Sequence, residues 1–116
     1  MTTLEALEAG RALLVRPYGI SWGGGARKAP TNDGLAHCSV TALQWVVKSR
    51  DGSVDKVAYD AAYDALAAAV PQEFDVWERP LKRLTVSAYH DSLQPHLALV
   101  LRWWDRTIEG LRRAAA

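Results

Sequence analysis

Residues 37–49 are apolar on nearly every side of the helix that they are expected to form, and this segment constrains the fold most. The apolar positions are Val40, Ala42, Leu43, Trp45, Val46 and Val47. A helix without a polar face has to be covered by other elements, so we expect it at the centre of the core. A chain of 116 residues can build one such core without disulfides or metal, which predicts a single domain spanning residues 1–116.

Three other segments have the spacing of amphipathic helices. In residues 3–15 the leucines fall close to one face, and Thr2 with Glu5 forms a capping pattern at the start. Residues 54–70 repeat valine, alanine and leucine at helical spacing without interruption. A last helix is expected to begin near Pro95, with an apolar stripe that includes Trp104.

Residues 84–90 alternate between apolar and polar side chains, which is typical of a strand. A strand needs a partner, and the candidates are Tyr18–Trp22 and Phe74–Trp77. The sequence therefore predicts an α+β fold, with about four helices around the central helix (37–49) packed on a small two- or three-stranded sheet.

Charge and composition exclude several functional classes. Fourteen basic and thirteen acidic residues leave a net charge of +1, so strong non-specific binding to nucleic acid is not expected. No apolar run approaches the roughly 18 residues that cross a bilayer, and the N-terminal residues lack the pattern of a signal peptide. A single cysteine, Cys38, excludes an internal disulfide. Together these features predict a cytoplasmic protein that does not bind membranes.

Residues 18–35 contain too many glycines and prolines for a regular element, and loops this long are commonly functional or disordered. Consecutive glycines expose backbone N–H groups, and the adjacent basic residues and aromatic rings suit an anionic or nucleotide-like ligand. The alternative is a flexible surface loop. The candidate ligand-binding residues are Tyr18, Trp22, Gly23, Gly24, Gly25, Arg27 and Lys28, together with Trp77 from another irregular segment.

A second hypothesis is a papain-like thiol hydrolase or transferase. Cys38 lies at the start of the central helix, where the helix dipole lowers the pKa of a thiol. His90 lies at the end of the predicted strand and could act as the base, with Asp91 orienting its ring. The alternative is that Cys38 is a small apolar residue of the core, which is common for a lone cysteine.

Metal and cofactor sites are not expected. His37, Cys38, His90, Asp91 and His96 are all possible zinc ligands, but their spacing matches no compact zinc motif.

Two residues of the last helix suggest an interface. Trp103 and Leu99 lie at the edge of the apolar stripe, so they either widen the core face or form an exposed patch. The second alternative would allow a protein partner or a homodimer.

The order of short motifs resembles a family of uncharacterised bacterial and phage proteins, classified as a domain of unknown function. That family has Trp-x-x-Gly, Cys-Ala-x-Gly-Ala-Leu, an Ala-rich helix, Trp-Asn-Asp, and a final helix with an acidic residue, a basic residue and an isoleucine. The corresponding segments here are Trp22–Gly25, Cys38–Leu43, Tyr89–Asp91 and Trp104–Ile108. Where the family has Gly-Ala this chain has Thr41-Ala42, and His90 replaces the asparagine, so the resemblance does not support His90 as a shared catalytic residue.

We therefore expect a small non-enzymatic binding protein without a cofactor. Its site would be the glycine-rich loop 18–35, to which Trp77 and the 89–96 segment could contribute, and its target either an anionic, nucleotide-like ligand or a protein partner. The resemblance is compatible with a phage-encoded inhibitor of host defence. The thiol enzyme based on Cys38 and His90 is the alternative.

Overall fold

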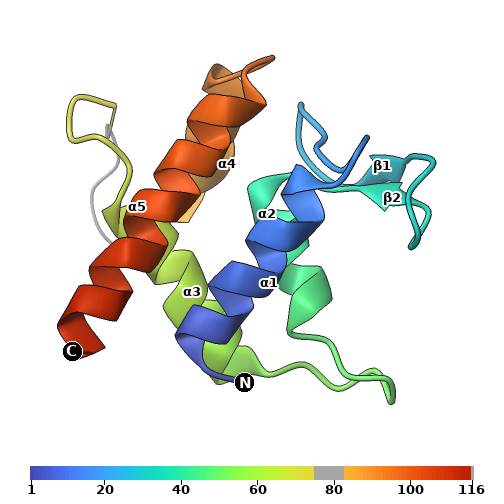
Figure 1. Cartoon of the computed structure of the whole chain (residues 1–116), viewed down its shortest axis with the longest axis horizontal. Helices are drawn as coiled ribbons and strands as arrows, with labels where there is room; N and C mark the ends of the chain where they lie inside the picture. The colour runs from blue at the N-terminus through green and yellow to red at the C-terminus, as the bar shows by residue number, and fades with distance from the viewer. Residues whose placement is uncertain (75–82, 116) are drawn as a thin grey trace.

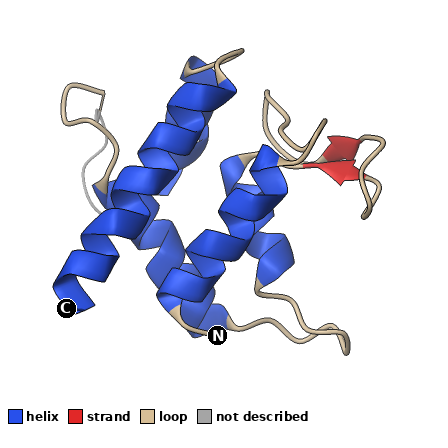
Figure 2. Cartoon of the chain, in the orientation of Figure 1, coloured by secondary structure: helices blue, strands red, loops and turns tan. Residues whose placement is uncertain are grey.

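The structure is a computed structural model that describes residues 1–74 and 83–115. In this part of the chain five helices and one two-stranded sheet give an α+β fold that is mostly helical (Figures 1 and 2). The elements are α1 (Thr3–Val15), β1 (Arg27–Lys28), β2 (Leu35–Ala36), α2 (Ser39–Val46), α3 (Lys56–Ala68), α4 (Leu84–Ser92) and α5 (Leu97–Ala115).

The helices with regular apolar spacing form where the sequence predicts them. α1 has the predicted bounds and the predicted cap, in which the Thr2 hydroxyl accepts from Glu5 N–H and the Glu5 carboxylate accepts from Thr2 N–H. α3 begins after Asp55, whose carboxylate accepts from Ala58 N–H at 3.1 Å. α5 begins at Leu97, two residues after Pro95, near which its start is predicted.

The predicted strand at residues 84–90 is wrong, because these residues belong to helix α4. The buried residues of α4 are Thr85, Val86 and His90, and this spacing follows a helix and not a strand. Two of these three are polar, so the apolar pattern alone concealed the helical period. Consequently the described chain has five helices, and α4 contributes no strand to the sheet.

The sheet forms inside the segment that was expected to be a loop. β1 and β2 are antiparallel, with Arg27 opposite Ala36 and Lys28 opposite Leu35. Ile20 forms an isolated parallel bridge with His37. The Tyr18–Trp22 segment, predicted as a strand partner, therefore pairs with the chain after β2 and not with residues 84–90. The hairpin lies beside α1 and α2, on the side of the molecule away from α5 (Figure 1).

The core is built mainly on α1, which packs against α2, α3 and α5, while α2 also packs against α3 and α4. α2 is not covered on every side, since Trp45 is 42% exposed instead of lying in the core. Trp104 is fully buried, as predicted, and so is Trp103, whose indole N–H donates to the Leu66 carbonyl. Trp103 therefore widens the core and does not form a surface patch. Within the described ranges, no helix is both long and apolar enough to cross a membrane.

Candidate functional site

His90 is the centre of a buried hydrogen-bond network that joins four parts of the chain. Its Nδ1 lies 2.7 Å from the Ser39 hydroxyl of α2, and its Nε2 lies 2.8 Å from the Ser21 carbonyl oxygen. The indole N–H of Trp104, from α5, donates to the same Ser39 hydroxyl at 2.9 Å. The Trp22 ring packs against the imidazole at 4.8 Å between centroids. His90 thus fixes the loop after α1 onto the helical core.

These partners are all satisfied by one neutral tautomer of His90. A carbonyl oxygen only accepts, so Nε2 carries the proton and donates it to Ser21. Nδ1 then accepts from the Ser39 hydroxyl, which accepts in turn from Trp104. Burial lowers the pKa of His90 from its ordinary value of 6.5, and the Ser21 carbonyl and the Asp91 charge oppose this with smaller effects.

This network makes the stability of the protein dependent on pH. The pKa of His90 is lower in the folded state than in the unfolded state, so between these two values the unfolded chain binds more protons. We expect the free energy of unfolding to be highest above about pH 6.5 and to fall below it, by at most about 1.4 kcal/mol per pH unit from this one group. Urea unfolding at pH 7.5, 6.5 and 5.5 measures this slope.

A matched pair of histidine variants identifies the group responsible. His96 is exposed at the turn before α5, so His96→Asn should keep the slope. His90→Gln should remove it from this pH window. An unchanged slope in His90→Gln would show that another group titrates.

The glycine loop is anchored by the residue that follows His90. The Asp91 carboxylate accepts from the Gly23 N–H at 2.9 Å. Gly23, Gly24 and Gly25 all have φ angles near +80°, a region that side chains rarely adopt, so this turn requires glycine. The sequence predicts His90 as a catalytic base and Asp91 as its orienting group, but in the structure the contacts of both residues hold this loop in place.

Cys38 lies immediately before α2 and is 3% exposed. Its Sγ is 3.6 Å from the Thr41 hydroxyl. Both ring nitrogens of His90 have other partners, and no hydrogen bond joins Cys38 to a histidine in the described residues. The thiol-enzyme hypothesis needs a thiol in contact with a base, and it stays a prediction.

A pocket of about 410 Å³ forms between the Tyr18–Trp22 segment, the hairpin and the turn before α5. We call it the aromatic–basic pocket, because four of the predicted ligand-binding residues line it. These are Tyr18, Trp22, Arg27 and Lys28. Ile20, Ala36 and Gln94 complete its walls, together with Ser21, Ala29 and Pro30.

The charge of the aromatic–basic pocket is positive. No carboxylate lines it, and neither Arg27 nor Lys28 forms an ion pair with any residue in the described ranges. The Arg27 Nε donates to the Trp22 carbonyl at 3.3 Å, which ties the guanidinium to the aromatic wall. The pocket therefore offers aromatic faces and two unneutralised cations.

Not every predicted site residue belongs to this pocket. The three glycines shape the adjoining turn without lining the pocket. Trp77 lies outside the described residues. Leu99 is 37% exposed on α5, but its predicted partner Trp103 is buried. Gln94 also lines the pocket and comes from the 89–96 segment, which was expected to contribute to the site, although no feature of Gln94 itself marks it as a site residue.

A larger hollow of about 680 Å³ follows one face of α5. All the residues that line it belong to that helix, and its charged residues alternate in sign, from Arg102 and Asp105 to Glu109 and Arg113. No second element contributes to it, so it lacks the convergence of side chains that a binding site needs. In the described part of the chain there is also no group of three or more His, Cys, Asp or Glu side chains that could hold a metal ion.

Comparison with known proteins gives one match. Residues 1–110 match the model of a family described as "Family of unknown function (DUF6197)". No curated protein and no solved structure matches this chain. The match covers nearly the whole sequence and agrees with the resemblance to an uncharacterised domain family. The chain belongs to the DUF6197 family.

Proposed function

We propose that this protein binds a small anionic, nucleotide-like ligand in the aromatic–basic pocket and performs no chemistry on it. The observation that carries this proposal is the pocket itself, where Tyr18 and Trp22 meet the unpaired cations Arg27 and Lys28. Base rings stack on aromatic side chains, and phosphate groups are attracted to lysine and arginine. Binding alone would also suffice for the wider role suggested by the family resemblance, inhibition of a host defence by a phage protein.

The backbone at Tyr18 supports this proposal. Tyr18 is the only non-glycine residue with positive φ in the described chain, at 59°, and its side chain is 73% exposed. A residue in this conformation costs about 1 kcal/mol or more, and such strain is concentrated at ligand sites. The exposed ring gains nothing from the core, so we infer that it is kept at the pocket rim for a ligand.

The supporting contacts of the pocket fit binding better than catalysis. The Ser21 hydroxyl donates to the Gly25 carbonyl, so it is not free to act as a nucleophile. No histidine, cysteine or carboxylate lines the aromatic–basic pocket. What the pocket offers is recognition by charge and stacking.

The test is to titrate the protein separately with AMP, adenosine and inorganic phosphate. Tryptophan fluorescence and calorimetry measure the affinity for each. We expect AMP to bind more tightly than either fragment, because it uses both the cations and the rings. Arg27→Glu should weaken AMP binding at least tenfold, while the free energy of unfolding should change by no more than about 0.5 kcal/mol because Arg27 is exposed.

Arg50→Glu is the matched control, since Arg50 is an exposed cation in the turn after α2 and does not line the pocket. It should leave AMP binding nearly unchanged. Equal losses in Arg27→Glu and Arg50→Glu would mean that only the overall charge attracts AMP. No binding of AMP at millimolar concentration would refute the proposal for this ligand.

A further inference from the structure

A second hollow, of about 240 Å³, has the same chemistry as the aromatic–basic pocket. We call it the Trp45 pocket, because the Trp45 ring of α2 lines it and is 42% exposed. Lys48 lines it as well, and this exposed cation forms no ion pair within the described ranges. No carboxylate of the described chain lines the Trp45 pocket. Like the aromatic–basic pocket, it therefore offers an aromatic face and an unneutralised cation.

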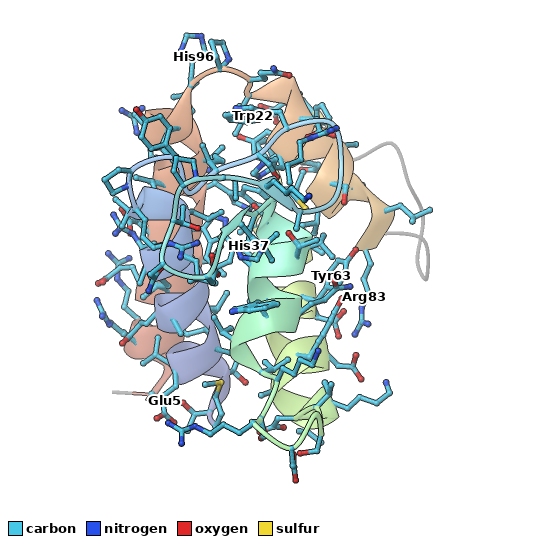
Figure 3. All side chains as sticks on the ribbon, turned by 90° about the vertical axis from the view of Figure 1, so that its right-hand side faces the viewer. Glu5, Trp22, His37, Tyr63, Arg83 and His96 are labelled. Atoms are coloured by element: carbon cyan, nitrogen blue, oxygen red, sulfur yellow. The ribbon has the colours of Figure 1, made fainter. Side chains whose placement is uncertain are left out.

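The two pockets adjoin along the β2 segment. Ala36 lines the aromatic–basic pocket, whereas its neighbour His37 lines the Trp45 pocket, as expected for extended chain. The Ser21 N–H donates to the His37 carbonyl at 2.9 Å, and the His37 ring lies 5.7 Å from the Trp45 ring. Figure 3 faces the side of the molecule that carries the hairpin and shows Trp22 above His37. The aromatic walls of the two pockets are thus connected through one short piece of chain.

The edge of the hairpin between the two pockets is basic. β2 has β1 on one side and an isolated bridge on the other, so β1 is the edge strand of the described sheet. β1 consists of Arg27 and Lys28, which are both exposed. The carboxylate of the hairpin, Asp33, is already paired with Arg16. Arg27, Lys28 and Lys48 are therefore left as unneutralised cations, and we call these three residues the basic edge.

This arrangement suits a polyanion that carries flat rings. The net charge of +1 predicts no strong attraction of nucleic acid by the whole chain, but the basic edge concentrates positive charge between two aromatic faces. Bases stack on aromatic rings whatever their identity, and phosphates bind lysine and arginine. Layers on the two faces of a sheet lie about 10 Å apart, and stacked nucleotides rise by about 3.4 Å each. A strand of about three or more nucleotides is therefore long enough to occupy both pockets.

We propose that the hairpin binds single-stranded nucleic acid. One base lies in the aromatic–basic pocket, another stacks on Trp45, and the phosphates between them contact the basic edge. This inference rests on the proposed function, because it makes the nucleotide in the aromatic–basic pocket one unit of a longer ligand. It adds that recognition uses stacking and phosphate contacts and does not depend on base sequence.

The test measures the affinity of the full chain for AMP, for hexadeoxyadenylate and for an abasic strand with the same number of phosphates, by calorimetry at low salt. Hexadeoxyadenylate should bind about fiftyfold or more tightly than AMP, well above the sixfold gain that six equivalent adenines give by statistics. The abasic strand carries the same charge without the bases. It should bind at least tenfold less tightly than hexadeoxyadenylate.

Two variants of the Trp45 pocket separate this inference from the proposed function. Trp45→Leu and Lys48→Met should each weaken hexadeoxyadenylate binding at least fivefold and leave the affinity for AMP nearly unchanged, because AMP fills only the aromatic–basic pocket. Both positions are exposed, and urea unfolding checks that the variants keep their fold. Lys48→Met should also make the salt dependence less steep, by about 0.7 in the logarithmic slope, because one phosphate contact is lost.

Arg102→Met is the matched control. It removes one exposed cation from α5, which lies away from the hairpin (Figure 1), and should leave hexadeoxyadenylate binding nearly unchanged.

Three outcomes would overturn the inference. The first is a gain over AMP of no more than sixfold. The second is equal binding of the abasic strand and hexadeoxyadenylate, which would show that the bases are not contacted. The third is unchanged binding of hexadeoxyadenylate in a folded Trp45→Leu protein. AMP binding together with any of these results would leave the proposed function intact, whereas the absence of both AMP and hexadeoxyadenylate binding would refute both proposals.

Discussion

Replacing His90 by alanine is expected to lower the free energy of unfolding by about 3–5 kcal/mol, a large share of the roughly 5–15 kcal/mol that stabilises a domain. The side chain is fully buried, and its removal leaves the Ser21 carbonyl and the Ser39 hydroxyl without their partner. Each such buried group costs about 1–3 kcal/mol, and the cavity left by the ring adds to this loss. Urea unfolding monitored by circular dichroism measures the difference.

His96→Ala is the matched control for this prediction. His96 is exposed, so its removal should change the free energy of unfolding by no more than about 0.5 kcal/mol. Because the His90 network also holds Ser21 and packs on Trp22, the His90→Ala protein should show altered tryptophan fluorescence as well. A loss below about 1 kcal/mol would mean that water replaces the imidazole and that the network is not a main support of the fold.

The sequence predicts those helices whose buried faces are apolar. α1 and α3 follow this rule, and both form close to the predicted bounds. α4 does not, because Thr85 and His90 are buried on its core face, and the remaining apolar residues happen to alternate. The hairpin could not be predicted either, since strands of two residues have no period to detect. Prediction from apolar periodicity therefore fails where polar residues occupy the buried face of a helix.

The candidate site was predictable only where it is local in sequence. Tyr18, Trp22, Arg27 and Lys28 lie within one irregular stretch, and the short chain between them keeps them close. Their anchors come from far along the chain: His90 reaches Ser21, and Asp91 reaches Gly23. The sequence does not distinguish residues that hold a loop from a catalytic pair. In either case the sequence shows only polar residues near the end of a strand or helix. The structure separates them by showing which atoms each side chain contacts.

Gly10→Val is expected to destabilise the protein by about 3 kcal/mol or more, and Gly10→Ala by about 1–3 kcal/mol. Gly10 is buried in α1, and a Cβ atom there would lie 2.9 Å from two atoms of the Trp104 ring. That ring is fully buried and its N–H donates to Ser39, so it cannot move away without breaking the His90 network. Thermal and urea unfolding measure both variants.

The same substitution in α5 separates this contact from helix propensity. A Cβ atom at Gly110 would meet nothing within 4 Å, so Gly110→Ala should raise the free energy of unfolding by up to about 1 kcal/mol. Helix propensity favours alanine over glycine equally at Gly10 and Gly110. A loss of free energy of unfolding in Gly10→Ala therefore has to come from the Trp104 contact. If both alanine variants stabilise the protein, α1 does not approach Trp104 as closely as the structure shows. Opposite signs would establish that this glycine is required for α1 to pack against α5.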